Sequence, residues 1–462
     1  MSPLMVLLSL LLLSAVGFYC GRRKALVVGL ASGTVRNLHS RPVYYGTLTA
    51  LWCGLPALII FAFWRAIESS IIVSMIINTL PPEMSSLPTD SLGLIVNEIK
   101  NLAAGNSFGG IKTPEIEAAA NYYTHLQAMS SVIQSTTMLV VGLAAVIFAI
   151  NRISPQLRAR NQVEAVLRTG MIFCSTIAIF TTIGIVLSVL FEAIRFFQKV
   201  PLTDFLFGLQ WSPQMSIRTD QVGSSGAFGA VPVFTGTLMI SALAMLVAVP
   251  IGLMAAIYLA EYAGKKVRAS AKPLIEILAG IPTVVYGFFA ALVVAPFIRD
   301  LGAKVGISVS SESALAAGLI MGIMIIPFIM SISDDVINAV PQSLRDGSYA
   351  LGATKSETVR LVLLPAALPG IVGGILLAVS RAIGETMIVV MAAGLSAKLT
   401  ANPLQAVTTV TVQIVTLLVG DQEFDSPKTL AAFALGLLLF LVTLLLNVTA
   451  LYIVRRYREQ YE

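Results

Sequence analysis

Nine apolar runs dominate the sequence, and each is long enough to cross a lipid bilayer as a helix. A spanning helix needs about 20 apolar residues. Of the 462 residues, 56% are hydrophobic and 12% are charged, whereas soluble domains carry about 25% charged residues. The sequence therefore predicts an all-α, polytopic membrane helix bundle. The runs cover roughly residues 3–20, 43–64, 131–150, 170–190, 233–260, 274–298, 313–332, 366–391 and 429–454.

Basic residues predict the orientation of these spans. Segments on one side of the membrane hold 19 of the 30 lysines and arginines, and such segments face the cytoplasm in most membrane proteins. We therefore expect an N-terminus outside and a C-terminus inside the cell. Arg22, Arg23 and Lys24 follow the first run rather than precede it, which predicts an uncleaved anchor and not a secretory signal. No basic stretch alternates with base-stacking aromatic residues, so nucleic acid is not an expected partner.

Loop lengths divide the chain into five segments. Residues 404–420 are too short to span but apolar, so we expect a re-entrant or interfacial segment there. The segments are an N-terminal transmembrane extension (1–64), a small periplasmic domain (65–130), a transmembrane pair with a periplasmic loop (131–232), a core of spans (233–454) with a cytoplasmic loop at 333–365, and a cytoplasmic tail (455–462).

The sequence gives little support for a metal site, a disulfide framework or covalent catalysis. The chain has 3 cysteines and 2 histidines. None of the cysteines forms a C-x-x-C pair, and all three lie in or beside apolar runs. We expect no cofactor, no metal site and no catalytic residue.

The loop at 341–365 carries the most informative motif. Gly352 can end or bend a helix, and Pro365 comes just before the next span. The pattern predicts a short helix, a turn and a second short helix at the membrane surface. Asp346, Gly347, Ser348, Gly352, Leu364 and Pro365 resemble the EAA loop of binding-protein-dependent ABC permeases. In that family the loop docks into a cleft of the ATPase subunit, so the resemblance implies a type I importer permease whose core is residues 233–454.

Two further stretches narrow the resemblance. Residues 276–287 (EILAGIPTVVYG) and 382–389 (AIGETMIV) are similar to phosphate ABC transporter permeases, and Gly384–Met387 to the PstC type. The resemblance implies import of inorganic phosphate, with a homologous second permease, two ATPase subunits and a periplasmic phosphate-binding protein as partners. The sequence has no G-x-x-x-x-G-K-[ST] loop, so a separate chain must hydrolyse ATP.

A charged pair inside one span is the candidate substrate pathway. Arg381 lies near the middle of the 366–391 run, with Glu385 one turn later, and about 100° per residue puts both on one helix face. An arginine there costs at least about 2.5–3.5 kcal/mol. Gly370 and Gly374 share that face, which predicts close contact with another helix. The pair either forms a structural ion pair or presents Arg381 to a passing oxyanion, and the sequence leaves both interpretations open.

Weaker candidates and rival functions remain open beside this pair. Glu276 and Thr283 share a face near the cytoplasmic end of their span and could serve a helix interface or the pathway. One rival function is the same architecture carrying sulfate or molybdate. Another is an ion-coupled secondary transporter, which would require paired, broken helices in two similar halves that the sequence does not show.

Overall fold

The computed structural model describes residues 3–31, 33–81, 89–105, 114–213, 226–419 and 425–458. Within these ranges nine helices are long and apolar enough to cross a membrane, which confirms the predicted number of spans and the all-α class. The chain divides into two compact units, unit 1 (Met1–Phe180) and unit 2 (Thr181–Glu462). Helix α6 (Ala159–Phe197) contributes to both units. The boundary between the two units falls inside residues 131–232, which the sequence analysis predicts to be a single segment.

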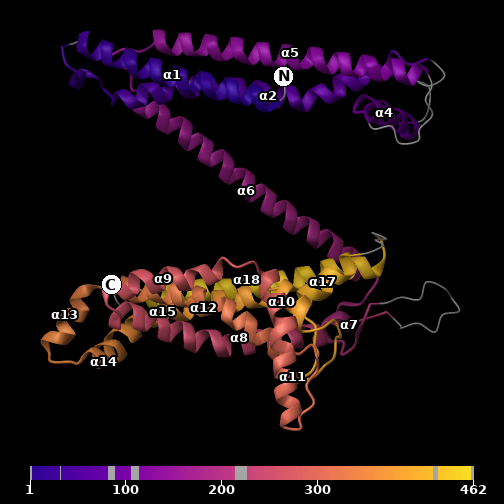
Figure 1. The fold of residues 1–462 in the computed structure, drawn as a ribbon, viewed down its shortest axis with the longest axis vertical. Helices are drawn as coiled ribbons and strands as arrows, with labels where there is room; N and C mark the ends of the chain where they lie inside the picture. The colour runs from indigo at the N-terminus through magenta and orange to yellow at the C-terminus, as the bar shows by residue number, and fades with distance from the viewer. Residues whose placement is uncertain are drawn as a thin grey trace. The chain divides into compact units, whose positions relative to one another are not determined.

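Three long helices that lie side by side form unit 1 (Figure 1). They are α1 (Pro3–Ala31), α2 (Pro42–Ile77) and α5 (Pro114–Asn151). Two glycines let α1 and α2 approach closely. A Cβ at Gly46 would lie 2.7 Å from the carbonyl oxygen of Phe18, and a Cβ at Gly21 would lie 2.3 Å from Thr49 Oγ1. No larger side chain fits at either position, so these glycines determine the α1–α2 distance.

The region expected to be a small periplasmic domain is helical where the structure describes it. Helices α2 and α5 have 36 and 38 residues and extend well past the predicted spans 43–64 and 131–150. Neither extension contains an internal glycine or proline that would end the helix. Helix α4 (Thr89–Ala103) packs against them through an apolar cluster that includes Ile72, Ile99 and Leu126. Pro82, Asn106 and Gly109-Gly110, which are part of the region predicted to be a small periplasmic domain, lie outside the described residues.

Unit 2 is organised around four packed helices. Small residues on α12 allow it to lie against α8, because a Cβ at Gly322 would be 2.9 Å from the carbonyl oxygen of Ala244. Ile240, Met321 and Ile325 belong to the buried cluster between and around these helices. The four helices are α8 (Val231–Ile257), α12 (Ala314–Ala339), α15 (Leu364–Ile383) and α18 (Pro427–Arg458).

The predicted close contact on the small-residue face of α15 is confirmed, and its partner is α12. A Cβ at Gly370 would lie 2.5 Å from Val336 Cγ1, and a Cβ at Gly374 would lie 2.5 Å from Ile332 Cγ2. Ala378, one turn further along, is fully buried. Branched side chains of α12 therefore occupy the space that the glycines of α15 leave open.

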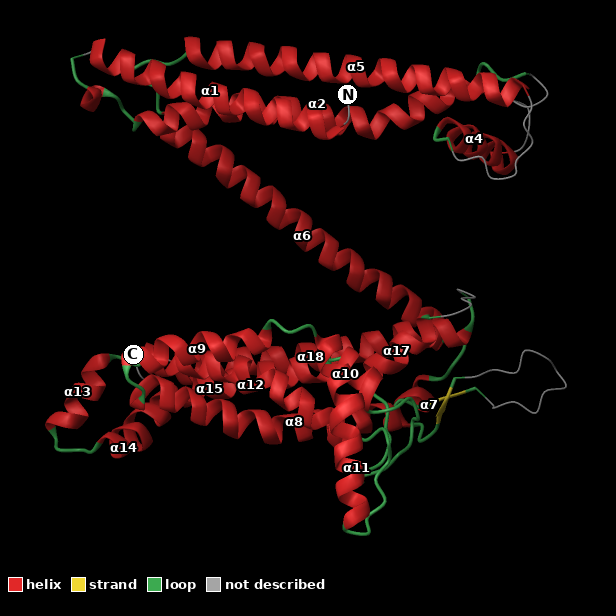
Figure 2. Cartoon of the chain, in the orientation of Figure 1, coloured by secondary structure: helices red, strands yellow, loops and turns green. Residues whose placement is uncertain are grey.

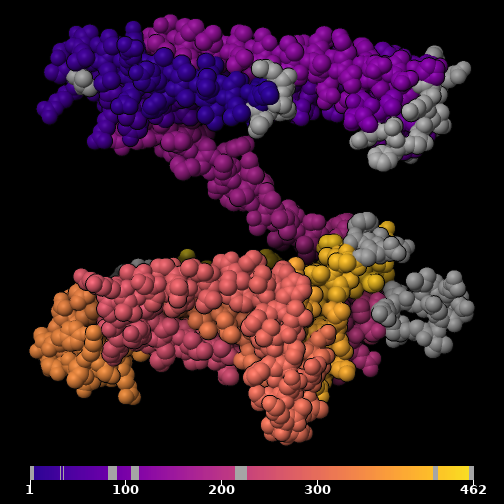
Figure 3. All heavy atoms as spheres, in the orientation of Figure 1, coloured from indigo at the N-terminus to yellow at the C-terminus, as the bar shows by residue number. Residues whose placement is uncertain are grey.

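Two predicted spans are broken helices. The 274–298 run is divided between α9 (Lys265–Ala279), α10 (Thr283–Phe289) and the wide π-turn η3 (Ala290–Val294), and α11 (Ala295–Lys304) projects from the bundle (Figure 3). Pro282, which lacks a backbone N–H, separates α9 from α10. The 366–391 run ends as a helix at Ile383, and the short α16 (Met387–Ala392) follows. The helix that is apolar enough to span is therefore 283–304 rather than 274–298.

The described residues of the segment 404–420 contain no helix long enough to cross a membrane. Their only helix is α17 (Val410–Leu418), whose nine residues extend about 13.5 Å, less than half of the hydrocarbon core. The extended chain before α17 lies directly against α8. A Cβ at Gly236 would lie 2.1 Å from the carbonyl oxygen of Thr408, and the backbone N–H of Val410 donates to Thr237 Oγ1 at 3.0 Å.

The described residues of the 191–232 segment form a small cap at one end of unit 2. It contains α7 (Leu202–Phe207) and an antiparallel pair, β1 (Trp211–Ser212) and β2 (Ala227–Phe228). Edge-to-face contacts join Phe196, Phe205 and Phe228. Figure 2 shows this hairpin at the end of unit 2 opposite α13 (Gln342–Ala350), as expected if one end faces the cytoplasm and the other faces outward. Of the Gly223–Gly229 cluster, only residues 226–229 are described.

Candidate functional site: a coupling loop and a broken helix

The predicted helix–turn–helix at 341–365 is present. Helix α13 ends in a turn where Gly352 has φ +86°, a conformation that side chains disfavour. Thr354 then caps α14 (Lys355–Thr358), and Glu357 completes the capping box. The second helix is not separate, however. It continues through the π-turn η4 (Val359–Leu363) into α15, so Leu364 and Pro365 occupy the first turn of a spanning helix.

Arg345 fixes α13 to the ends of two spanning helices. Its Nη1 and Nη2 donate to the carbonyl oxygens of Val340 and Ile337 at 2.6 and 2.7 Å, at the C-terminus of α12. Its Nε donates to Glu261 Oε1 at 3.1 Å, in the π-turn η2 (Tyr258–Tyr262) that continues α8. Helix ends leave carbonyl groups without partners. A buried guanidinium supplies those donors here and joins three elements at one point.

The remaining motif residues divide between the inner and outer faces of α13. Ser348 is buried, and its hydroxyl lies 2.9 Å from Thr358 Oγ1, which connects α13 to the end of α14. Asp346 and Gly347 are exposed, and Asp346 accepts a hydrogen bond from Gln342 Nε2 at 3.1 Å. Leu351 is 91% exposed. Sequence reasoning missed Arg345 and Leu351, although a lone arginine and an exposed leucine inside a polar loop are signals that could have been followed.

A second charged cluster lies beside the coupling loop. Asp334 of α12 is fully buried and accepts two hydrogen bonds from Arg268 Nη2, both at 3.0 Å, and one from Lys272 Nζ at 2.7 Å. Its hydrogen bond with the ammonium group raises the pKa of Lys272. Because Arg268 and Lys272 belong to α9, the cluster holds one end of α9 against α12.

The structure separates Arg381 from Glu385 and corrects their expected arrangement. Helix α15 ends at Ile383, with Gly384 as its C-cap, so Arg381 is in the last turn and Glu385 is beyond the helix. Glu385 Oε1 instead accepts from the backbone N–H groups of Met387 and Ile388 at 3.0 and 3.4 Å, at the start of α16. These two residues, both within the described ranges, form no ion pair with each other. The i,i+4 pairing fails because the helix does not continue through Gly384.

The charge of the Arg381 guanidinium is therefore not neutralised by Glu385. Its guanidinium carbon lies 5.5 Å from the centroid of the Phe328 ring of α12, a cation–π distance. The side chain is exposed in the isolated chain. A guanidinium held over an aromatic ring, with no carboxylate partner among the described residues, can bind an oxyanion through its planar fork of N–H groups.

A hydroxyl group of α17 contacts the backbone where α15 ends. Thr411 Oγ1 donates to the carbonyl oxygen of Glu385 at 2.8 Å and lies 3.0 Å from Thr409 Oγ1. Gln413 Nε2 donates to the carbonyl oxygen of Leu395 at 3.1 Å, and Trp211 Nε1 donates to Gln413 Oε1 at 2.8 Å. The interruption between α15 and α16 and the segment that contains α17 are thus hydrogen-bonded to each other, which sequence reasoning did not foresee.

The weaker candidates lie elsewhere. Glu276 is exposed on α9 and lines a cavity of about 360 Å³ with Lys265, Arg268 and Lys272. Thr283 is half-buried at the first position of α10. The structure therefore does not place either residue in a hydrogen bond or ion pair with Arg381 or Glu385.

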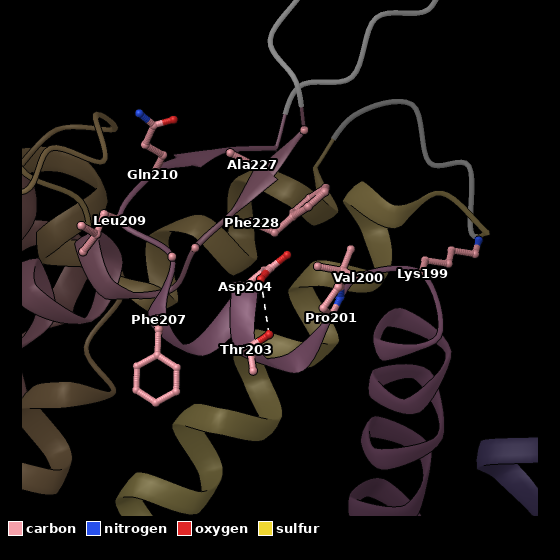
Figure 4. A pocket seen from close by; sticks show the side chains of 13 residues that line it. Lys199, Val200, Pro201, Thr203, Asp204, Phe207, Leu209, Gln210, Ala227 and Phe228 are labelled. Atoms are coloured by element: carbon pink, nitrogen blue, oxygen red, sulfur yellow. Dashed lines mark hydrogen bonds between the residues drawn. The ribbon is translucent and has the colours of Figure 1, made fainter.

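A separate cavity of about 870 Å³ lies at the opposite end of unit 2 from α13. It is bounded by α7 and the β1–β2 hairpin, and Figure 4 shows Asp204 and Lys199 among the side chains that line it. None of the site residues expected from the sequence contributes to this cavity.

Comparison with known proteins identifies the family. A family model described as "Binding-protein-dependent transport system inner membrane component" matches residues 248–459, and one described as "Phosphate ATP-binding cassette transporter" matches residues 7–181. The phosphate transport system permease protein PstC of Mesorhizobium japonicum is 36% identical over 50% of this chain and 74% of its own length. This chain belongs to the PstC-type phosphate ABC transporter permeases.

Other relatives support the same family. PstC 1 of Mycobacterium tuberculosis is 36% identical over 54% of this chain and 81% of its own length. A probable ABC transporter permease, YqgH of Bacillus subtilis, is 36% identical over 59% of this chain and 84% of its own length. The coupling loop and the broken helix both lie inside the match at 248–459. A separate family model matches residues 7–181, which include most of the N-terminal transmembrane extension.

Proposed function

We propose that this chain is the membrane-spanning subunit of an ATP-driven importer that carries inorganic phosphate across the cytoplasmic membrane. The observation that carries the proposal is the similarity to PstC permeases over most of their length. The chain has no nucleotide-binding loop. ATP hydrolysis therefore belongs to two separate ATPase subunits, and this subunit is not catalytic.

The coupling loop is the contact for those ATPase subunits. Asp346, Gly347 and Leu351 lie on the exposed side of α13, where a partner can bind. On the buried side, Arg345 binds the ends of α8 and α12. ATP-driven movement of α13 then acts directly on two spanning helices. Gly352, Leu364 and Pro365 shape the return of the chain into α15.

Phosphate passes the broken helix in this proposal. Arg381 offers donors without a carboxylate partner among the described residues, and the Glu385 carboxylate is held at the start of α16. Arg381 attracts phosphate without enclosing it in a complete binding site, which suits a transport pathway because the anion must dissociate again. A homologous second permease covers the exposed Arg381 side chain, and Glu276 and Thr283 serve a helix interface or the pathway.

The cap at the other end of unit 2 faces the periplasm. A periplasmic phosphate-binding protein delivers its cargo there, next to the cavity beside α7. This arrangement follows the predicted orientation, with the N-terminus outside, the C-terminus in the cytoplasm and the 65–130 region on the outer side.

Uptake of radiolabelled phosphate tests the proposal. The chain is co-expressed with its neighbouring permease, ATPase and binding protein in cells that lack high-affinity uptake. Wild type, Arg381→Gln and an ATPase-dead partner are compared, with sulfate and molybdate as competitors. We expect ATP-dependent uptake that both competitors leave unchanged, and its loss in Arg381→Gln. Uptake that sulfate or molybdate suppresses would reassign the cargo to another oxyanion.

A further inference from the structure

Unit 1 contains a polar cavity that has no part in the function proposed above. Its volume is about 370 Å³, and it lies among α1, α2 and α5. Apart from Val6 and Ala128, its lining is polar or charged, although α1, α2 and α5 are all apolar enough to span a membrane. It is lined by Val6, Arg65, Glu68, Thr124, Gln127, Ala128, Ser131 and Gln134.

A hydrogen-bonded chain across α2 and α5 fixes a carboxylate in this cavity. Trp64 Nε1 donates to Ser130 Oγ at 2.9 Å, and Ser130 Oγ donates to Glu68 Oε1 at 2.7 Å. Arg65 Nη1 donates to Glu68 Oε2 at 2.9 Å. The Glu68 side chain is only 9% exposed, whereas that of Arg65 is 50% exposed. The carboxylate is therefore held in place before any ligand arrives, and it keeps lone pairs for a further donor.

Two residues that line the cavity, Arg65 and Gln134, carry N–H groups without an acceptor among the described residues. Gln134 is 6% exposed, and its Nε2 is buried without a hydrogen-bond partner among the described residues. Buried amide groups are normally paired, so an unpaired one indicates a missing partner. Within the same part of the chain, Glu68 engages only Nη1 of Arg65. The rest of that guanidinium can donate to another acceptor.

The position of the cavity along the helices indicates the depth of the ligand. Arg65 and Glu68 come directly after the apolar run 43–64, which ends at Trp64. Tryptophan is enriched where the hydrocarbon core meets the headgroups. A ligand in this cavity would therefore lie at the level of lipid headgroups.

We propose that unit 1 binds the headgroup of a phospholipid that carries both a phosphodiester and a primary ammonium. Arg65 and the Gln134 amide donate to the phosphate oxygens, and Glu68 accepts from the ammonium. A guanidinium and a carboxylate in one cavity suit such a zwitterion better than a simple anion, because Glu68 would repel an anion that has no ammonium. The proposal does not depend on which cargo unit 2 transports.

The test measures lipid retained by the purified full-length chain, using native mass spectrometry after exchange into defined vesicles. Vesicles contain phosphatidylethanolamine, phosphatidylcholine or phosphatidylglycerol, so that only the first offers a primary ammonium beside the phosphate. We expect selective retention of phosphatidylethanolamine. Equal retention of all three lipids, or displacement of the lipid by millimolar inorganic phosphate, would overturn the proposal.

Variants locate the binding to this cavity. We expect Gln134→Leu, Glu68→Gln and Arg65→Gln each to lower retention about tenfold, as for the loss of one charge-assisted hydrogen bond. Arg65 is half-exposed, so its variant should fold even if the buried ones do not. Arg160→Gln is the matched control, because Arg160 forms an exposed ion pair with Glu164 on α6, away from this cavity's lining. Unchanged selectivity in Arg65→Gln, or equal loss in Arg160→Gln, would overturn the assignment.

Discussion

Arg345 Nε lies 3.1 Å from Glu261 Oε1, and each of these side chains is only 9% exposed. The contact joins residues 84 positions apart, one in the coupling helix and one in the π-turn that continues α8. Arg345 also closes the C-terminus of α12 through the Ile337 and Val340 carbonyls. An ATPase that moves α13 therefore acts on α8 through the Arg345 side chain, and on α12 through that side chain and through the short connection at Val340 and Pro341.

Arg345→Gln should destabilise the protein and uncouple transport. The change leaves the buried Glu261 carboxylate without its cation, and breaking a buried pair costs about 3–5 kcal/mol. Thermal unfolding in detergent measures the stability, and phosphate uptake with ATPase activity of the assembled complex measures coupling. Arg158→Gln, an exposed arginine between α5 and α6 and outside the coupling loop, is the control and should change neither. Full uptake by Arg345→Gln would contradict this role.

Two glycines of the loop should respond differently to substitution. Gly352 has φ +86° and open space on the side where a Cβ would lie, so Gly352→Ala should cost about 1–2 kcal/mol through the backbone alone. A bulky Gly352→Val should also block transport while the complex still assembles. Gly347 is helical and equally open, so Gly347→Ala should be neutral or stabilise by up to about 1 kcal/mol. Equal effects on thermal unfolding would show that the turn geometry is unimportant.

Leu351→Asp should prevent binding of the ATPase subunit. The side chain is 91% exposed at the tip of the loop, and a charge there would have to be desolvated in an apolar contact. Co-purification of the ATPase with this chain measures the effect. Leu399→Asp places the same change on an exposed leucine of the loop after α16 and should leave co-purification intact. Normal ATPase recovery with Leu351→Asp would move the docking surface elsewhere.

Neighbouring aspartates on α12 should differ sharply in importance. Asp334 has no exposed surface and binds both Arg268 and Lys272, whereas Asp335 is 70% exposed. We expect Asp334→Asn to lose about 3–5 kcal/mol of unfolding free energy. Asp335→Asn should lose about 1 kcal/mol or less, as for a surface pair. Both values come from thermal unfolding under one set of conditions, and similar losses would refute the assignment.

The spans were predictable because apolar length is a local property of the sequence. The same runs did not reveal where helices continue or break. Helix α2 extends to Ile77 because polar residues can continue a helix beyond the membrane, and α15 stops at Ile383 because Gly384 follows. The expected Arg381–Glu385 pair assumed an unbroken helix. Arg345 escaped notice because its role depends on carbonyl groups of α12 and on Glu261, which only the tertiary structure brings together.

Helix α8 links the two ends of unit 2 in a mechanical sense. Its last turn leads into η2, where Glu261 binds Arg345, and near its start Gly236 touches the backbone at Thr408. Its 27 residues span about 40 Å, so a tilt of about 5° about one end displaces the other by about 3.5 Å. Because Gly236 is in direct contact with the backbone at Thr408, a small rotation imposed at the coupling loop displaces the chain segment before α17 by the same movement. α8 thus acts as a lever arm. Its stiffness determines how far a movement of the coupling loop at one end displaces the chain at the other end of unit 2.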